Sequence, residues 1–282
     1  SDNKSDFIPA KKILIPVNKE NVKKYNIVGE KDYDKIVDTV ELTISGKTIG
    51  KADLIVLDIL SEYNWDRPIY FVSMGGDVDL GLKPWLQFNG FSYKLVPIKT
   101  PDYRDTPQIN SDDMYNQLMN VYRFESLKNT KMHVDYQNLY TFEAVSPIRD
   151  MFVQTAEKLI KEGEKEKAVN LLDRCVDIMP TENFPYNVSM LHSTNELSIV
   201  KIIEQYLKCG QKDKAISVAD QFVLETFQTI EYFISPRGND MIYKEGVDAN
   251  ISFLYYLIHT LKNNGAEEYA ATLESKIASL LS

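Results

Sequence analysis

An Asp-x-Asp pair is the pattern in this chain whose residue types and spacing could most directly support chemistry. Asp77 and Asp79 lie in a glycine-rich run that follows an expected strand. Two such carboxylates offer the hard oxygen ligands that a divalent cation prefers, and the cation could hold a sugar-nucleotide diphosphate. An EF-hand calcium loop fits poorly, because Gly81 stands where a third oxygen ligand belongs and no closing Glu follows at the right distance. Gly and Asp are also common turn residues, so we favour a surface loop and keep the metal site as the alternative.

Arg67 is the second candidate, because it lies between Asp66 and Pro68 and next to Trp65. A guanidinium group at this place could bind a phosphate or a carboxylate. The alternative, which we favour, is that Arg67 stacks on Trp65 and pairs with Asp66. It would then fix the turn between a helix and a strand.

The remaining reactive residue types form no catalytic motif. His133, His192 and His259 are far apart and lack metal-ligand spacing. Cys175 and Cys209 both lie in helical patterns, where we expect unpaired core thiols. The chain contains no nucleophile elbow, phosphate-binding glycine loop or HExxH motif. The sequence therefore predicts no catalytic site and no cofactor.

Composition narrows the function classes further. Hydrophobic residues make up 44% and charged residues 26% of the 282 residues, which is typical of a folded soluble protein. The formal charge of −9 disfavours a nucleic-acid-binding protein, which needs clustered positive charge. No apolar run reaches the length of about 18 residues that a membrane span requires. The polar start is no signal peptide, and we expect that the chain has been cut from a larger protein.

The elements expected up to about residue 125 alternate between strands and helices. β-Branched and apolar runs predict strands, and the apolar positions of 51–63 predict a largely buried helix with Asn64 as its left-handed stop. This alternation indicates a small α/β layer with a mixed sheet. The expected strands are 12–17, 40–45, 69–73 and 91–98, and the expected helices are 51–63, 83–88 and 112–124.

The second half of the chain has a helical repeat pattern. Gly163, Ala168, Cys175 and Pro180 keep the spacing of a tetratricopeptide-like helical hairpin, in which a turn glycine separates two helices and small residues lie where they pack. A polar stretch at 128–135 places the domain boundary there. We therefore predict an α+β protein, with a mixed α/β domain at 1–130 and a tetratricopeptide-like helical domain at 131–282; a plain helical bundle is the alternative. The glycine-to-alanine spacing recurs at Gly210–Ala215 and Gly265–Ala270.

A stack of such hairpins would present the first helix of each pair on a concave face. This face would combine aliphatic, aromatic and charged side chains, which suits an extended polypeptide better than a sugar phosphate. An insertion at 228–248, with Glu231, Tyr232, Phe233, Pro236 and Arg237, would either add an aromatic anchor or fill the groove from within. The predicted concave residues are Val153, Glu157, Lys161, Val200, Glu204, Lys208, Tyr255, His259 and Lys262.

An ordered set of short motifs resembles one known family. The set begins with Leu57-Asp58-Ile59 and with the run from Asn64 to Phe71, in which Asn64, Trp65, Arg67, Pro68 and Tyr70 form the signature. In this order the motifs are similar to the C-terminal region of multi-pass membrane proteins of Bacteroidetes, the protein O-mannosyltransferase-like glycosyltransferases. The later motifs are Leu80-Gly81-Leu82, Trp85-Leu86, Tyr93-Lys94-Leu95-Val96-Pro97, Leu172-Asp173-Arg174-Cys175, and Pro180 followed by Glu182-Asn183-Phe184-Pro185-Tyr186.

The resemblance implies a membrane-bound transferase that depends on a lipid-linked sugar and precedes this chain in the same polypeptide. The catalytic acids of that family lie in the membrane part, so none is carried over to a residue here. The resemblance thus implies a non-catalytic accessory domain on the periplasmic face of the inner membrane. Its partners would be the membrane domain and acceptor proteins, without nucleic acid and without membrane insertion of its own.

Two rival functions belong to other classes. A stand-alone repeat scaffold would bind peptides or proteins without any membrane domain. A soluble sugar transferase would use Asp77 and Asp79, but it would need a larger nucleotide-binding sheet than about 100 residues supply.

Overall fold

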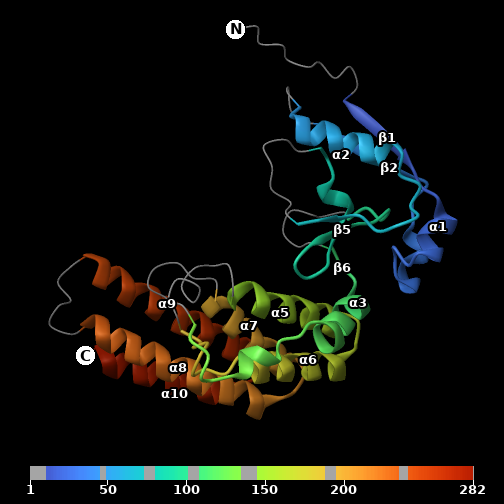
Figure 1. The fold of residues 1–282 in the computed structure, drawn as a ribbon. Coiled ribbons are helices and arrows are strands. Elements are labelled where there is room, and N and C mark those ends of the chain that lie inside the picture. Colours follow the sequence, from blue (N-terminus) through green and yellow to red (C-terminus); the bar gives the residue numbers. More distant parts are fainter. Residues whose placement is uncertain are drawn as a thin grey trace, which may run out of the picture. The chain divides into compact units, whose positions relative to one another are not determined.

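The computed structural model describes residues 11–44, 49–72, 80–100, 108–134, 145–187, 195–234 and 241–281 (Figure 1). The chain divides into two compact units, unit 1 at Ser1–Met114 and unit 2 at Tyr115–Ser282. Unit 1 mixes strands and short helices, and unit 2 is a stack of helices. The predicted α+β fold is therefore confirmed. Within the described ranges, no helix is both long enough and apolar enough to cross a membrane.

Unit 1 contains two small sheets. The first pairs β1 (Lys12–Pro16) antiparallel with β2 (Thr39–Thr43), so that Leu14 lies opposite Glu41. The second has the strand order β3-β5-β4-β6 and is mixed, because β4 and β6 run parallel whereas the other pairs are antiparallel. Its strands are β3 (Tyr70–Phe71), β4 (Leu86–Phe88), β5 (Tyr93–Leu95) and β6 (Gln108–Ile109). The helical elements are α1 (Lys19–Lys24), η1 (Glu30–Lys35), α2 (Lys51–Ser61) and η2 (Lys83–Trp85).

Two buried tryptophans connect the first sheet to the rest of unit 1 by hydrogen bonds. The indole N–H of Trp65 donates to the carbonyl oxygen of Pro16 at 2.8 Å, and that of Trp85 donates to the carbonyl oxygen of Glu41 at 2.9 Å. Both rings are almost completely buried. Each ring therefore contributes apolar burial and also satisfies its polar N–H.

Three local expectations for unit 1 are corrected. The left-handed residue after α2 is Trp65, with φ 58°, and not Asn64. The expected helix 83–88 is a single 3₁₀ turn followed by strand β4. Most importantly, α2 is not largely buried, because Leu60 is its one buried residue.

Unit 2 begins with a short helical segment and continues as three helical hairpins. Helix α3 (Ser111–Asn116) spans the division between the units and runs into a π-helical turn, η3 (Gln117–Val121), which η4 (Glu125–Lys128) follows. Helices α5, α7 and α9 are the first helices of the hairpins and lie next to one another in order. The hairpins are α5 (Val145–Lys161) with α6 (Lys165–Ile178), α7 (Asn195–Lys208) with α8 (Lys212–Ile234), and α9 (Met241–Asn263) with α10 (Glu267–Leu281).

The three predicted glycine turns share one backbone arrangement. Gly163, Gly210 and Gly265 have φ values of 86°, 77° and 80°. In each turn the N–H after the glycine donates to a carbonyl five residues earlier, as in a Schellman motif, at 2.9 to 3.0 Å. That same residue then accepts, through its carbonyl, the first hydrogen bond of the next helix. The alanines five residues after each glycine are fully buried, as their small size predicts for closely packed helices.

Residues 115–128 pack with the helices, whereas the sequence placed them in the first domain. The Arg174 guanidinium donates to the carbonyl oxygen of Leu118 at 2.9 Å and forms an ion pair with Glu125 at 3.2 Å. Phe124 packs on Phe152 with ring centroids 5.9 Å apart. These contacts explain why the division falls after Met114, ahead of the predicted boundary at 130/131.

The junctions between hairpins repeat a polar contact that the sequence did not reveal. Asp173 and Asp220 each stand ten residues after the glycine of their turn. Asp173 pairs with Lys214 at 2.5 Å, and Asp220 accepts from the hydroxyl group of Tyr269 at 2.6 Å. Lys214 and Tyr269 themselves stand four residues after the next turn glycine. Equivalent positions therefore meet at both junctions, which supports a true structural repeat.

Candidate functional site

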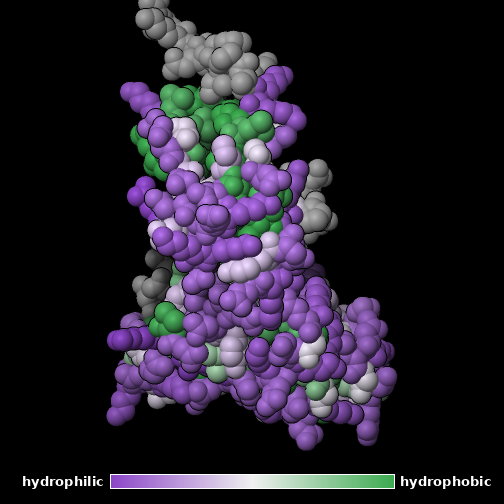
Figure 2. Space-filling view, turned by 90° about the vertical axis from the view of Figure 1, so that its right-hand side faces the viewer, coloured by the Kyte–Doolittle hydropathy of each residue, from purple (hydrophilic) through white to green (hydrophobic). Residues whose placement is uncertain are grey.

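The outward side of α2 is an exposed apolar surface, which we call the α2 face. It is formed by Leu54, Ile55 and Ile59, whose side chains are 40%, 61% and 48% exposed. Ile55 and Ile59 are four residues apart and therefore neighbours on the helix surface. Figure 2 shows hydrophobic residues gathered in the region of α2 and the β1–β2 pair of unit 1. An exposed apolar surface of this kind is a candidate for an interaction site.

Charged residues interrupt the α2 face. Asp58 follows Ile55 by three residues and so lies on the same side of the helix, as does Glu62 one turn later. Both are exposed, and within the described residues neither forms an ion pair. A carboxylate immersed in lipid is costly. The face therefore suits a protein surface, which can pair with these carboxylates, better than the interior of a bilayer.

The signature residues next to α2 serve the fold of unit 1. The side chain and the carbonyl group of Asn64 accept hydrogen bonds from Asn18 and Asn21, at 3.0 and 2.8 Å. Trp65 packs on Tyr63, with ring centroids 4.6 Å apart, and is fully buried. These contacts fix the turn after α2.

Arg67 does not hold this turn in the way the sequence suggested. Its side chain is exposed, and its carbonyl oxygen accepts from the hydroxyl group of Tyr63 at 2.6 Å. Within the described residues it neither stacks on Trp65 nor pairs with Asp66. Pro68 is exposed and precedes β3, while Tyr70 is partly exposed within it.

A polar group of side chains lies at the second sheet of unit 1. Lys94 on β5 is buried, and its ammonium group donates to the carbonyl oxygen of Asn26 at 3.2 Å. Burial lowers the pKa of Lys94, and the nearby Asp113 opposes this shift. Burial also raises the pKa of Tyr70, and Asp113 adds to the effect. Asp113 is thus the charged group that contributes to both pKa shifts.

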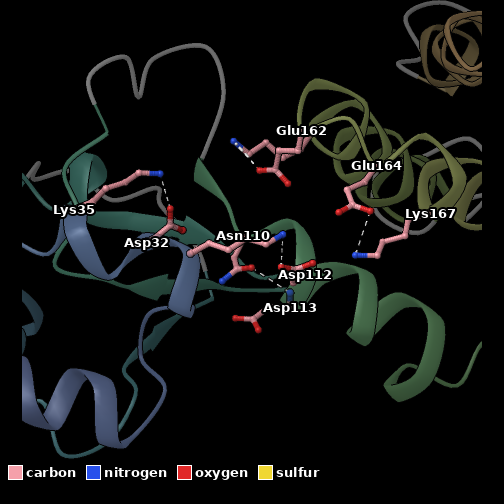
Figure 3. Close-up of polar contacts among 10 residues, drawn as sticks. Asp32, Lys35, Asn110, Asp112, Asp113, Glu162, Glu164 and Lys167 are labelled. Carbon is pink, nitrogen blue, oxygen red and sulfur yellow. Dashed lines mark hydrogen bonds and ion pairs between the residues drawn. The ribbon is translucent and has the colours of Figure 1, made fainter.

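The start of α3, close to this group, is held by local contacts. Figure 3 shows the side-chain oxygen of Asn110 accepting from the backbone N–H of Asp113, at 3.2 Å. Asp112 pairs with Lys31 at 2.6 Å, and Asp32 pairs with Lys35 at 2.6 Å. These carboxylates are engaged in ordinary structural contacts.

Asp77 and Asp79 lie outside the described residues, as do Pro236 and Arg237. Whether the Asp pair binds a metal therefore stays a prediction. Among the residues that the structure describes, no group of three His, Cys, Asp or Glu side chains could hold a metal ion.

The residues predicted for the concave face are of two kinds. Val153 and Val200 are buried in the helical core, so they do not offer the aliphatic contact that the prediction assigned to them. The charged residues form ion pairs within or between helices: Glu157 with Lys161 and Glu204 with Lys208 at 2.8 Å, and Lys262 with Glu274 at 2.6 Å. His259 contacts Asn263, and Tyr255 is 52% exposed. Peptide binding by this face stays a prediction.

Two further ion pairs, each between residues three or four positions apart, lie beside the turn at Gly163. Glu162 pairs with Lys158 at 3.3 Å, and Glu164 pairs with Lys167 at 3.5 Å (Figure 3). Such exposed pairs contribute little to stability, and they leave the turn polar.

The described part of the insertion expected at 228–248 is helical. Residues up to Ile234 continue α8, and α9 begins at Met241. Glu231 and Tyr232 are exposed, whereas Phe233 is buried. Phe233 lies so close to Gly246 that a Cβ atom there would be 2.8 Å from the ring. The described part of the insertion therefore belongs to two long helices, the end of α8 and the start of α9.

The segment at 181–187 belongs to the connection between the first two hairpins. We call it the crossing segment. The guanidinium group of Arg149 on α5 donates to the carbonyl oxygens of Phe184 and Pro185, at 2.6 and 3.4 Å. On α8, the Glu225 carboxylate accepts from the backbone N–H groups of Tyr186 and Asn187, at 2.5 and 2.9 Å. The main chain is thus held by one cation and one anion on different helices.

Side chains of the crossing segment are held as well. The amide nitrogen of Asn187 donates to Thr226 on α8 at 2.9 Å and to Asn250 on α9 at 2.6 Å. The Tyr186 ring lies under the Arg149 guanidinium at 5.3 Å, and burial raises the pKa of its hydroxyl group to about 12. The motif from Glu182 to Tyr186 was noticed in the sequence, but its aromatic and amide residues did not reveal which helices they contact.

Comparison with known proteins gives a match for unit 1. Residues 1–113 match the family model described as TMEM260-associated domain 2. The matched part ends one residue before the division after Met114, so it coincides with unit 1. This TMEM260-related match agrees in part with the resemblance noted from the sequence motifs. No curated protein and no solved structure matches the chain.

Proposed function

We propose that this chain is a non-catalytic accessory region of a membrane-bound protein glycosyltransferase. In this proposal the transferase domain precedes the chain in the same polypeptide, and the chain lies on the periplasmic side. The observation that carries the proposal is the match of residues 1–113 to a TMEM260-associated domain, together with the exposed α2 face inside that matched part.

The α2 face is the proposed contact with the transferase domain. Burial of its apolar side chains would contribute a favourable free energy of about 25 cal/mol per Å² of apolar surface removed from water. Asp58 and Glu62 require a partner with basic or hydrogen-bonding groups, which favours an extramembrane loop over lipid. The accessory role is then to stabilise the transferase or to position acceptor proteins beside it.

The first test concerns the gene and the isolated chain. The full-length gene should encode membrane spans before this region, and the purified chain should not turn over lipid-linked or nucleotide sugars. A gene without membrane spans would replace this proposal with a stand-alone repeat scaffold. Sugar turnover by the chain that is lost on Asp77→Ala would instead establish a soluble transferase.

The second test concerns the α2 face in the full-length protein. The double substitution Ile55→Glu/Ile59→Glu should lower glycosylation of acceptor proteins while leaving unit 1 folded, because both side chains are exposed. Leu197→Glu on α7 is the matched control, since Leu197 is also an exposed aliphatic residue on a helix. Equal glycosylation by the double variant, the control and the unaltered protein would contradict the proposed contact.

A further inference from the structure

The end of α2 carries acidic side chains that the helix itself disfavours. Asp58 lies in the last turn of α2, and Glu62 directly follows the helix. The aligned backbone dipoles make the C-terminal end of a helix negative, so that basic residues are favourable there and acidic residues are unfavourable. Helix α1 of the same unit follows this rule with Lys23 and Lys24 in its last turn, whereas the last turn of α2 has no basic residue.

A similar acid at the end of α6 shows how the chain can offset this cost. Asp177 lies in the last turn of α6 and forms an ion pair with Lys128, which belongs to η4. The cation is thus supplied by another segment. Among the described residues, no cation forms an ion pair with Asp58 or Glu62. This leaves both carboxylates of α2 accessible to a cation from a partner of unit 1.

The acidic and aliphatic side chains of α2 form two neighbouring rows. Asp58 and Glu62 are four residues apart, as are Ile55 and Ile59, and each acid follows an isoleucine by three residues. Residues three and four positions apart are neighbours on a helix surface, so each acid lies beside one of the isoleucines. Four residues rise about 6 Å along the helix axis. A partner that contacts both rows therefore needs two cationic groups about 6 Å apart, next to aliphatic side chains.

We propose that the α2 face binds a basic amphipathic segment of the transferase domain. Two Lys or Arg side chains of this segment pair with Asp58 and Glu62, and its aliphatic side chains pack on Ile55 and Ile59. The inference rests on the proposed function and deepens it by naming the chemistry of the partner. A membrane surface fits this pattern poorly, because its anionic lipids attract basic segments and repel carboxylates.

Charge variants of the full-length protein test the pairing. Asp58→Lys/Glu62→Lys should lower glycosylation of acceptor proteins at least about tenfold, because it places like charges opposite each other at the contact. Asp58→Asn/Glu62→Gln keeps the shape of the side chains and should lower glycosylation less. Glu245→Lys/Asp248→Lys is the matched control, since it reverses two exposed acids one turn apart on α9, and it should leave glycosylation unchanged.

The stability of unit 1 separates this pairing from a role in the fold. Lysine at the end of α2 is favourable to the helix, so Asp58→Lys/Glu62→Lys should not lower the urea midpoint of unit 1 in the 282-residue chain. Tryptophan fluorescence measures this midpoint, because both tryptophans lie in unit 1. A midpoint that falls together with glycosylation would show that the two acids serve the fold, and it would overturn the inference.

Photo-cross-linking in the full-length protein identifies the partner segment. A photoreactive residue in place of Ile55 should give adducts in a part of the transferase domain that contains two Lys or Arg residues. Short loops with an excess of these residues are typical of the cytoplasmic side of a membrane, so such a segment on the other side is readily recognised in the sequence.

The possible results distinguish this inference from the proposed function. Adducts in a segment of the transferase domain without Lys or Arg would overturn the basic partner and leave the proposed contact intact. Equal glycosylation by the charge-reversed variant and the control would do the same if Ile55→Glu/Ile59→Glu still lowers it. Adducts that avoid the transferase domain altogether would contradict both.

Discussion

The helices of unit 1 and unit 2 differ in how completely their apolar side chains are buried. In unit 1, helix α2 buries only Leu60 and leaves aliphatic side chains exposed. In unit 2, helices α6 and α8 bury apolar residues along their whole length, although Leu224 and Ile234 of α8 are exposed. Both units nevertheless have well-packed cores, with two buried tryptophans in the one and fully buried alanines in the other.

This difference shows that the α2 face is a local property of one helix. The core of unit 1 is closed by Trp65, Trp85 and the inner sides of β1 and β2. Leu54, Ile55 and Ile59 do not belong to that core, and the contact proposed for the α2 face would account for their apolar character. In unit 2, the exposed apolar residues of the described ranges are spread over several helices, among them Leu197 of α7, Ile234 of α8 and Tyr255 of α9.

The largest expected effect concerns the tryptophan that closes unit 1. Trp65→Ala should lower the free energy of unfolding of unit 1 by about 3–5 kcal/mol, because it removes a fully buried ring and the hydrogen bond to Pro16. Both tryptophans of the chain lie in unit 1, so the fluorescence of Trp85 reports on this unit during urea unfolding. Tyr70→Ala, which removes a half-exposed ring, should cost far less. Equal effects would show that the core is not closed by Trp65.

Two glycines with positive φ, one in each unit, differ in the space that surrounds them. Gly81 in unit 1 and Gly163 in unit 2 both have positive φ, but a Cβ at Gly81 would lie 2.4 Å from the backbone nitrogen of Thr43, whereas one at Gly163 would meet nothing within 4 Å. Gly81→Ala should therefore destabilise unit 1 by about 2–4 kcal/mol, and Gly163→Ala should cost unit 2 about 1 kcal/mol. Denaturant unfolding followed by tryptophan fluorescence and by helical circular dichroism measures the two separately. A similar cost at both sites would contradict the close approach at Gly81.

The crossing segment provides a smaller effect that is specific to unit 2. Glu225→Ala leaves the N–H groups of Tyr186 and Asn187 without their acceptor, which should cost about 1–3 kcal/mol. Glu231→Ala is the control, because it removes an exposed carboxylate from the same helix. Thermal unfolding monitored at 222 nm measures both variants. If the two variants unfold alike, the segment is held by Arg149 and Asn187 without help from Glu225.

Thiol labelling of Cys175 and Cys209 measures how accessible two positions of unit 2 are, and it needs no substitution. Both are unpaired; Cys175 is buried, and burial raises the pKa of its thiol to about 12. At pH 8 only about one Cys175 thiol in ten thousand is then ionised, and the thiolate is the reactive form. A thiol reagent should label the half-buried Cys209 first and Cys175 only after unfolding. Mass spectrometry of the folded protein identifies the labelled site, and early labelling of Cys175 would show that the first hairpin opens.

The sequence predicted the helical stack better than unit 1, and the reason is physical. Turn glycines and buried alanines impose local requirements on φ and on side-chain size, so Gly163 and Ala168 carried the signal by themselves. The exposure of α2 depends on which tertiary neighbours cover it, and apolar composition alone suggested a buried helix. The contacts of Arg149, Asp173 and Glu225 join residues that lie 35 to 41 positions apart, and no local pattern specifies them.

The candidate sites show the same limit. The signature around Trp65 was visible as a motif, yet its role in fixing the turn after α2 depends on Asn18, Asn21 and Pro16, which are more than forty residues away. The hollow between α8 and α10 is lined by residues of both helices, which are far apart in the sequence. Its residues Leu224, Lys276 and Leu280 carry no pattern of their own in the sequence.

The shared residue in each glycine turn limits where the stack can change in length during evolution. Glu164, Gln211 and Ala266 complete one helix and start the next, so an added residue there would break two hydrogen-bond patterns at once. The unequal intervals of 47 and 55 residues between the turn glycines at 163, 210 and 265 come from helix length, because α8 and α9 have 23 residues each whereas α6 and α7 have 14 each. New sequence can therefore accumulate at one end of the hairpins only, and that end is where relatives should differ most and where a label can be inserted with least disturbance.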